Sequence, residues 1–257
     1  MINVKVTEPS GTIILERPEK CNALNRSLLQ ELGQALDDLH QEKRARCIIL
    51  SGSGAHFCSG LDVAELNETA KSQDALNRWH EDSQLLHSIL LKMLQSPKPI
   101  IAAVDGNAVG AGFALALASD LIVASHRAKF SVPAPKLGLV SGLCIPLLNF
   151  RTGAGISSQI VLGGEELTAE QGKELGFVHH LVAPDQVWVR SKTWGDSIAE
   201  GAAEALQLTK RVLNEMVGEQ LSSQLASGAA ASATAMTTEA ARVGLEAFAS
   251  KQTPEFP

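Results

Sequence analysis

The segment "PIIAAVDGNAVGAGFALALASD", residues 99–120, constrains the fold more than any other part of the sequence. It begins with an apolar run that ends at Gly106, as in a buried strand. Gly110 and Gly112 then open a second apolar run, which meets no charge before Asp120. A buried strand, a glycine turn and an apolar helix in succession are typical of α/β proteins. Glycines at the start of a helix indicate that a ligand approaches the backbone closely.

Strand and helix patterns alternate from residue 1 to about 190, which predicts an α/β architecture. We expect two short strands around a Pro-Ser-Gly turn in 4–18, a helix over 25–42, a buried strand over 47–52, a polar loop as far as residue 66, a helix over about 74–95 and two strands within 121–132. Residues 200–250 have no strand signal and predict helices.

The chain therefore divides into two predicted regions. Residues 1–195 form the α/β core, and residues 196–257 form a helical C-terminal region. The alanine-rich composition of the second region suits close helix packing, and we expect that packing to lie between subunits.

Composition and charge exclude several classes of protein. The chain has 257 residues, of which 45% are hydrophobic and 19% charged, as in one soluble globular unit. Its net charge of −6 and the absence of a basic run argue against nucleic acid as a partner. No segment reads as a secretory signal or a membrane span, so we expect a cytoplasmic protein. The four cysteines are scattered, which argues against structural zinc and against a disulfide framework.

Two glycine-containing loops remain once the common cofactor motifs are excluded. The sequence lacks a dinucleotide fingerprint, a P-loop, a zinc-protease helix and a nucleophile elbow, so no cofactor is expected. Loops 56–62 and 106–113 each follow a buried strand, and their small residues would let a ligand reach backbone N–H groups. Two such donors could form an oxyanion hole. Two ordinary strand-to-helix turns would have the same spacing.

Six segments, in order along nearly the whole chain, give a more specific signal. They are "RPEKCNALN" (17–25), "HFCSGLDVAEL" (56–66), "KPIIAAVDGNAVGAGFALALASDLIVAS" (98–125), "KFSVPAPKLGL" (129–139), "LTAEQGKELGFVHHLV" (167–182) and "AFASKQTPEF" (247–256). In these segments the chain resembles the crotonase (enoyl-CoA hydratase/isomerase) superfamily. The resemblance implies a spiral of ββα units, a helical C-terminal trimerisation region and a homotrimer or dimer of trimers. It also implies a coenzyme A thioester as the substrate.

The resemblance assigns roles to individual residues. The oxyanion donors would be the backbone N–H groups of Leu61 and Ala111, and Lys251 would meet the CoA phosphates. Alanine at 111, where the family usually has glycine, requires a backbone conformation open to residues with a Cβ. The remaining residues expected along the substrate and CoA path are Lys20, Cys21, Ala23, Ser59, Gly60, Asp62, Val63, Ala64 and Gly110.

At the positions where the family carries its catalytic acids, this sequence has no acidic residue. Hydratases use two glutamates around one water, and here Ala114 and Ala134 stand in their places. The acid position of the isomerases falls at Gly142. Alanine and glycine cannot exchange a proton, so hydration by the usual pair of carboxylates is in doubt.

Other side chains could supply proton transfer. His87 occupies a place similar to that of a base in the family's dehalogenase branch, although a lone histidine on a half-apolar helix face is more often structural. Ser141 and Cys144 are weak nucleophiles without a paired base. The acids of residues 65–82, such as Glu68, Glu81 and Asp82, could act as part of a lid, although we expect most of them to be solvated.

Two functions stay open at this point. The first is an acyl-CoA enzyme that stabilises a thioester enolate and uses unusual proton transfer, as in isomerisation, decarboxylation or thioester cleavage. The second is a CoA-thioester-binding protein without hydratase activity.

Overall fold

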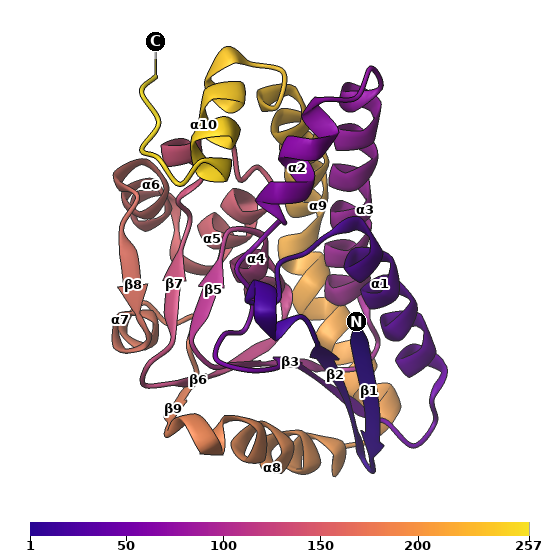
Figure 1. Cartoon of the computed structure of the whole chain (residues 1–257). Coiled ribbons are helices and arrows are strands. Elements are labelled where there is room, and N and C mark those ends of the chain that lie inside the picture. The colour runs from indigo at the N-terminus through magenta and orange to yellow at the C-terminus, as the bar shows by residue number, and fades with distance from the viewer. Residues whose placement is uncertain (257) are drawn as a thin grey trace.

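A six-stranded sheet forms the base of the structure, with the strand order β1-β2-β3-β4-β6-β9 (Figure 1). The computed structural model describes the backbone of residues 1–256 and the side chains of 1–214 and 220–256. The strands are β1 (Ile2–Thr7), β2 (Ser10–Leu15), β3 (Cys47–Gly52), β4 (Ile100–Val104), β6 (Leu121–Ser125) and β9 (His180–Val182). Only the β1–β2 pair is antiparallel, and the other neighbours pair in parallel.

A second sheet of three strands stands beside the first, in the order β5-β7-β8. It contains β5 (Asn107–Val109), β7 (Lys129–Ser131) and β8 (Glu166–Thr168). The chain repeats one unit, in which a strand of the large sheet is followed by a strand of the small sheet and then by a helix. The first such unit is β4, β5 and α4 (Ala111–Ala118), and the next is β6, β7 and α5 (Cys144–Thr152). This repeat is the spiral of ββα units expected from the sequence, and the α/β fold class is confirmed.

The remaining helices cover the two sheets. They are α1 (Arg26–Gln41), α2 (Val63–Ala70), α3 (Ala75–Gln95), α6 (Ala154–Gly163), α7 (Ala169–Glu174), α8 (Val187–Ala199), α9 (Ala203–Ala235) and α10 (Glu239–Ala249), with short 3-10 turns at Pro18–Lys20, Ala134–Leu137 and Pro184–Gln186. No helix among the described residues is long and apolar enough to cross a membrane.

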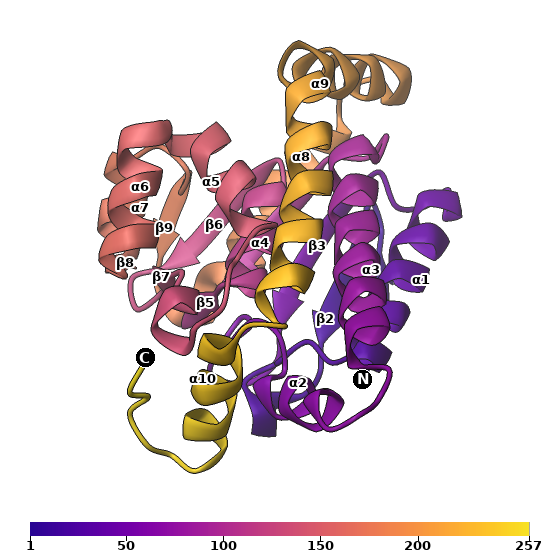
Figure 2. The same cartoon turned by 90° about the horizontal axis from the view of Figure 1, so that it is seen from above.

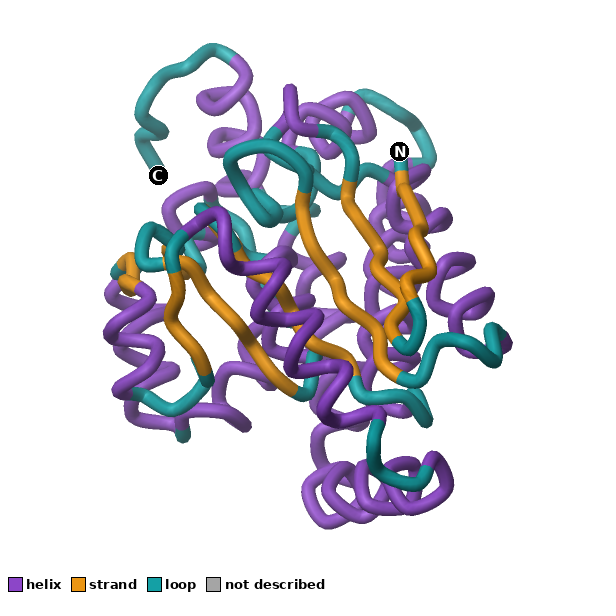
Figure 3. Tube along the Cα trace, turned by 90° about the horizontal axis from the view of Figure 1, so that it is seen from below, coloured by secondary structure: helices purple, strands orange, loops and turns teal. Residues whose placement is uncertain are grey.

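Alternating side chains of the large sheet form two separate cores. Ile49, Ile101 and Val123 point to one face, where they pack with Val187 of α8. Figure 3, seen from below, shows α8 lying across the strands on that side. The intervening residues, such as Ile48, point to the other face and join the main core under α1, α3 and α4. This period of two is the reason for the near-continuous apolar runs in the strand sequences.

The helix α2 is a difference from the sequence prediction, which placed a polar loop as far as residue 66. The helix begins at Val63 because the Asp62 carboxylate caps it, accepting hydrogen bonds from the Ala64 N–H (3.1 Å) and the Glu65 N–H (3.3 Å). The cap turns the chain immediately after Leu61. Leu61 is consequently fixed between a loop and a helix N-terminus.

The C-terminal helices lie over the same side of the large sheet as α3. The 33-residue helix α9 packs along α3, as seen from above in Figure 2, and α10 packs against α2. Near its end, α9 meets the segment before α5: Ser232 Oγ accepts from the Gly142 N–H (3.0 Å) and donates to the Val140 carbonyl (3.1 Å). The C-terminal helices thereby form one wall of the space above the sheet.

Candidate active site

The loop after β3 and the turn after β5 run side by side. Cys58 and Ala108 form a parallel bridge, with hydrogen bonds from the Cys58 N–H to Asn107 (3.0 Å) and from the Val109 N–H to the Cys58 carbonyl (2.9 Å). Gly60 has a φ of +94°, and a Cβ there would lie only 2.8 Å from the Val109 carbonyl oxygen. Glycine at this position therefore allows the two backbones to approach each other.

Two backbone donors at this junction lack acceptors among the described residues, namely the N–H groups of Leu61 and Ala111. The amides next to them are occupied: those of Asp62 and Gly110 donate to carbonyl groups at 3.0 and 2.9 Å. A Cβ built on Gly60 would lie 3.6 Å from the Ala111 nitrogen, so the two turns nearly touch. Ala111 is the first residue of α4, whose dipole adds positive potential at the same place.

The backbone at Ala111 accommodates a side chain. The unusual conformation belongs to the preceding Gly110, with a φ of 52°, whereas Ala111 is helical and is not among the non-glycine residues with positive φ. Gly112 has a different constraint, because a Cβ there would lie 2.3 Å from the Cys58 carbonyl oxygen. Alanine is thus sterically acceptable at 111 and excluded at 112.

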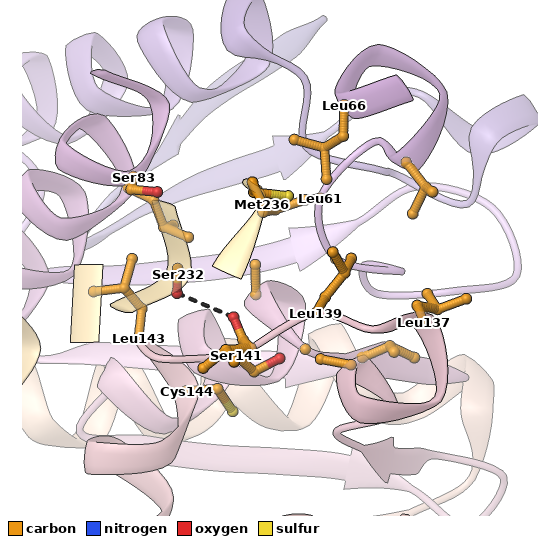
Figure 4. Close-up of a pocket in the computed structure, with 18 of the residues that line it drawn as sticks. Leu61, Leu66, Ser83, Leu137, Leu139, Ser141, Leu143, Cys144, Ser232 and Met236 are labelled. Carbon is orange, nitrogen blue, oxygen red and sulfur yellow. Dashed lines mark hydrogen bonds between the residues drawn. The ribbon is translucent and has the colours of Figure 1, made fainter. Parts of the chain in front are cut away.

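Leu61 and Ala111 both line a cavity with a volume of about 110 Å³ (Figure 4). Its walls come from the two turns, from α2 and α3, from residues 133–144 and from the end of α9. Most of the lining is apolar, with Leu139 and Met236 facing Leu61 in Figure 4. The polar side chains in the lining are Ser59, Trp79, Asp82, Ser83, Ser141, Cys144 and Ser232. The site is therefore a small apolar cavity beside two unused backbone donors.

The chain matches known proteins along almost its whole length. The family model described as enoyl-CoA hydratase/isomerase matches residues 9–257. The chain belongs to the enoyl-CoA hydratase/isomerase family. It is 35% identical over 216 residues to "Probable enoyl-CoA hydratase echA6" of Mycobacterium bovis, covering 84% of this chain and 83% of that protein. It is 29% identical to 1,2-epoxyphenylacetyl-CoA isomerase of Escherichia coli, with 95% and 94% covered.

A solved structure of the family agrees closely in fold. The enoyl-CoA hydratase from Bacillus halodurans is 28% identical and superposes with a TM-score of 0.89, covering 96% of this chain and 99% of that one. The relatives thus include proteins named as hydratases and a protein named as an isomerase. Membership of this family does not by itself specify the reaction, which depends on the residues that line the cavity.

The three positions where the resemblance would place acids hold alanine or glycine, and their surroundings differ. Ala114 is fully buried in the main core and does not line the cavity. Ala134 does line it. A Cβ on Gly142 would lie 2.0 Å from the carbonyl oxygen of Gly228 in α9, so any side chain there would push this helix away. The structure therefore leaves no room for the isomerase acid at 142.

His87 is not among the residues that line the cavity. Its Nε2 atom is buried, with no hydrogen-bond partner in the described part of the chain. Burial lowers the pKa of His87 below the ordinary histidine value. The imidazole is consequently kept neutral at physiological pH, and its role as a base stays a prediction.

Ser141 and Cys144 both line the cavity. A Cβ on Gly110 would lie 3.7 Å from Ser141 Oγ, which places this hydroxyl next to the turn after β5. Burial raises the pKa of the Cys144 thiol to about 12. A thiol with that pKa is almost entirely protonated at neutral pH, so Cys144 is a poor nucleophile here.

The residues expected at the oxyanion site and along the CoA path lie in four places. Ser59, Gly60, Leu61, Val63 and Gly110 line the cavity. The loop of Lys20, Cys21 and Ala23 lies against these residues, because the Ser59 N–H donates to the Cys21 carbonyl at 3.0 Å. Asp62 and Ala64 lie at the start of α2, where Asp62 also pairs with Arg17 at 3.0 Å. Lys251 is exposed just beyond α10, with a φ of 56°.

The helix α3 forms a wall of the cavity that was not predicted from the sequence. Trp79, Asp82, Ser83 and Leu86 line the cavity, and their spacing of three and four residues places them on one helix face. On this helix only His87 was singled out from the sequence as a candidate for proton transfer, with Glu81 and Asp82 named among the acids of a possible lid. Without the structure, no face of this helix could be assigned to the cavity. No group of three or more His, Cys, Asp or Glu side chains in the described chain could hold a metal ion.

Proposed function

We propose that this chain is an acyl-CoA-processing enzyme that stabilises a thioester enolate with the N–H groups of Leu61 and Ala111. The main support for the proposal is that these two N–H groups lack acceptors among the described residues and that both residues line the same apolar cavity. A thioester oxygen gains negative charge when a proton leaves the adjacent carbon, and two fixed donors stabilise that charge without reorganisation. The apolar lining would hold the acyl chain and exclude water.

The CoA moiety would leave the cavity along the loop of residues 20–23 and residues 59–64. Lys20 and Lys251 are exposed and could pair with phosphate groups of CoA. No cofactor is needed, because coenzyme A is part of the substrate.

A homotrimer or dimer of trimers in the cytoplasm is the assembly we propose. The first half of α9 supports self-association, because Leu208, Val212 and Leu213 are more than half exposed there. Sedimentation equilibrium would measure the mass of the assembly.

The alternative is a CoA-thioester-binding protein without hydratase activity. The observation that favours it is alanine at both hydratase acid positions, 114 and 134. Such a protein would keep the fold and the binding cavity without performing chemistry.

Incubation with crotonyl-CoA in D₂O, followed by mass spectrometry of the CoA species, separates these functions. Addition of water would show hydration without the usual carboxylates, and exchange of carbon-bound hydrogen alone would show enolate formation. Either result supports an enzyme. An unchanged thioester with saturable binding would instead support the binding protein.

A further inference from the structure

One carboxylate lines the cavity, and it comes from the wall formed by α3. Asp82 is the only Asp or Glu among the lining residues found in the described chain. It lies on the same face of α3 as Trp79, Ser83 and Leu86, all of which line the cavity. The cavity that contains the Leu61 and Ala111 amides therefore also contains one group able to accept a proton.

Arg26 fixes the Asp82 carboxylate in place. Arg26 Nε donates to Asp82 Oδ1 at 2.6 Å, and the side chain of Asp82 is only 15% exposed. Arg26 is itself held by Glu81 at 3.0 Å and by the Arg78 carbonyl at 3.2 Å. Asp82 Oδ2 has no hydrogen-bond partner in the described part of the chain. Arg26 thus holds Asp82 Oδ1, and Asp82 Oδ2 is available to accept a proton.

The same carboxylate borders a second, polar pocket. This pocket has a volume of about 600 Å³ and is lined by Arg26, Glu65, Glu68, Thr69, Asp74, Arg78, Glu81 and Asp82. Glu65 also contacts Arg26, accepting from its backbone N–H at 2.9 Å. Burial raises the pKa of the Glu65 carboxyl, which makes it a better proton acceptor than an ordinary glutamate. Asp82 therefore separates the acyl cavity from an acidic pocket through which protons can exchange with solvent.

We propose that Asp82 is the catalytic base of this active site, and that the reaction is a 1,3 proton shift within an unsaturated acyl-CoA. The proposal rests on the proposed function. The bond between the α-carbon and its hydrogen breaks, and the proton passes to Asp82 Oδ2. The electron pair forms a dienolate whose oxygen accepts hydrogen bonds from Leu61 and Ala111. Asp82 then returns a proton to the γ-carbon, and the double bond moves from the β,γ to the α,β position.

A single carboxylate is enough for this reaction but not for hydration. In the proton shift the same group removes and returns the proton, so no second acid and no bound water are required. Hydration needs one group to activate water and another to protonate carbon. Alanine at 114 and 134 together with one aspartate on α3 therefore fits an isomerase better than a hydratase.

The test follows conversion of 3-hexenoyl-CoA to 2-hexenoyl-CoA in D₂O by mass spectrometry and absorbance. The variants are Asp82→Asn and the matched control Asp37→Asn. Both aspartates form an ion pair with a basic side chain, but only Asp82 lines the cavity. We expect Asp82→Asn to lower kcat by about 100-fold or more, the usual contribution of a general base. Asp37→Asn should keep kcat within about threefold of the wild type, in line with the small effect of an exposed ion pair such as that of Asp37 with Lys92.

A second variant separates chemistry from folding. Asp82→Gly should be inactive, and added formate should restore part of its activity by occupying the vacated carboxylate position. Wild-type rates in Asp82→Asn would overturn the role of Asp82 and leave the proposed function intact. A wild type that hydrates crotonyl-CoA but does not isomerise 3-hexenoyl-CoA would overturn the proton shift alone. A wild type inactive on both substrates would refute the proposed function and this inference together.

Discussion

Replacing Ala111 with proline would remove one oxyanion donor and leave the rest of the fold in place. Proline lacks the backbone N–H and is well tolerated at the first position of a helix, which Ala111 occupies in α4. The Ala111 N–H has no acceptor among the described residues, so no internal hydrogen bond is lost. The preceding residue is Gly110, whose lack of a Cβ reduces the usual steric conflict before proline. We expect the free energy of unfolding to change by less than about 1 kcal/mol.

The effect on catalysis should be much larger. Loss of one of two oxyanion donors costs about 2.7–4 kcal/mol of transition-state stabilisation, or roughly 10²–10³-fold in kcat. The assay is exchange of the α-hydrogens of butanoyl-CoA into D₂O, followed by mass spectrometry. The control is Ala111→Gly, which keeps the N–H and restores the residue usual in the family. An Ala111→Pro variant that exchanges within about threefold of the wild-type rate would refute the oxyanion role of this amide.

Two further predictions concern stability. Gly142→Ala should lower the free energy of unfolding by about 1–3 kcal/mol, because its Cβ would lie 2.0 Å from the Gly228 carbonyl oxygen. Gly155→Ala, with nothing within 4 Å, should match or exceed wild-type stability in the same urea titration. Burial lowers the pKa of His179 to about 4. Below a pH of about 6.5 the unfolded chain therefore binds a proton at His179 that the folded chain does not bind. The free energy of unfolding decreases as the pH falls from about 6.5 toward 4. The decrease is at most about 3 kcal/mol, because the ring is only half-buried. His179→Asn, whose amide oxygen can still accept from the Ile122 N–H, should flatten this pH dependence of Tm, and an unchanged slope would contradict the assignment.

The spiral core was predictable because each repeat has a local signature. The segment from Ile100 to Ala118 contains a buried strand, a glycine turn and an apolar helix, and the structure forms β4, β5 and α4 from it. The conformation of Ala111 was not predictable, since it depends on Gly110 carrying the unusual φ. The start of α2 was missed, although Asp62 with Glu65 three residues later is a recognisable N-terminal signal.

The walls of the cavity required the structure. A helix over about 74–95 was expected, and the structure forms it as Ala75–Gln95. An amphipathic pattern, however, does not say which polar residues face a ligand. Asp82 was predicted only as one of several acids of a possible lid, most of them solvated. Its ion pair with Arg26 joins residues 56 positions apart and gives no local signal. The close contact of Gly142 with Gly228 joins segments still farther apart along the chain. Long-range packing, rather than local propensity, defines this part of the site.

The central claim is that the Leu61 and Ala111 amides polarise a thioester carbonyl. Infrared difference spectra of butanoyl-CoA labelled with ¹³C at the carbonyl carbon would test it most directly, because the acyl chain is saturated and cannot add water. Hydrogen bonds from two fixed donors weaken the carbonyl bond, so the account predicts a shift of its stretching band to lower wavenumber on binding to the wild type. The shift should be reduced in Ala111→Pro and kept in Ala111→Gly. Saturable binding with the band at its position in water would contradict the account.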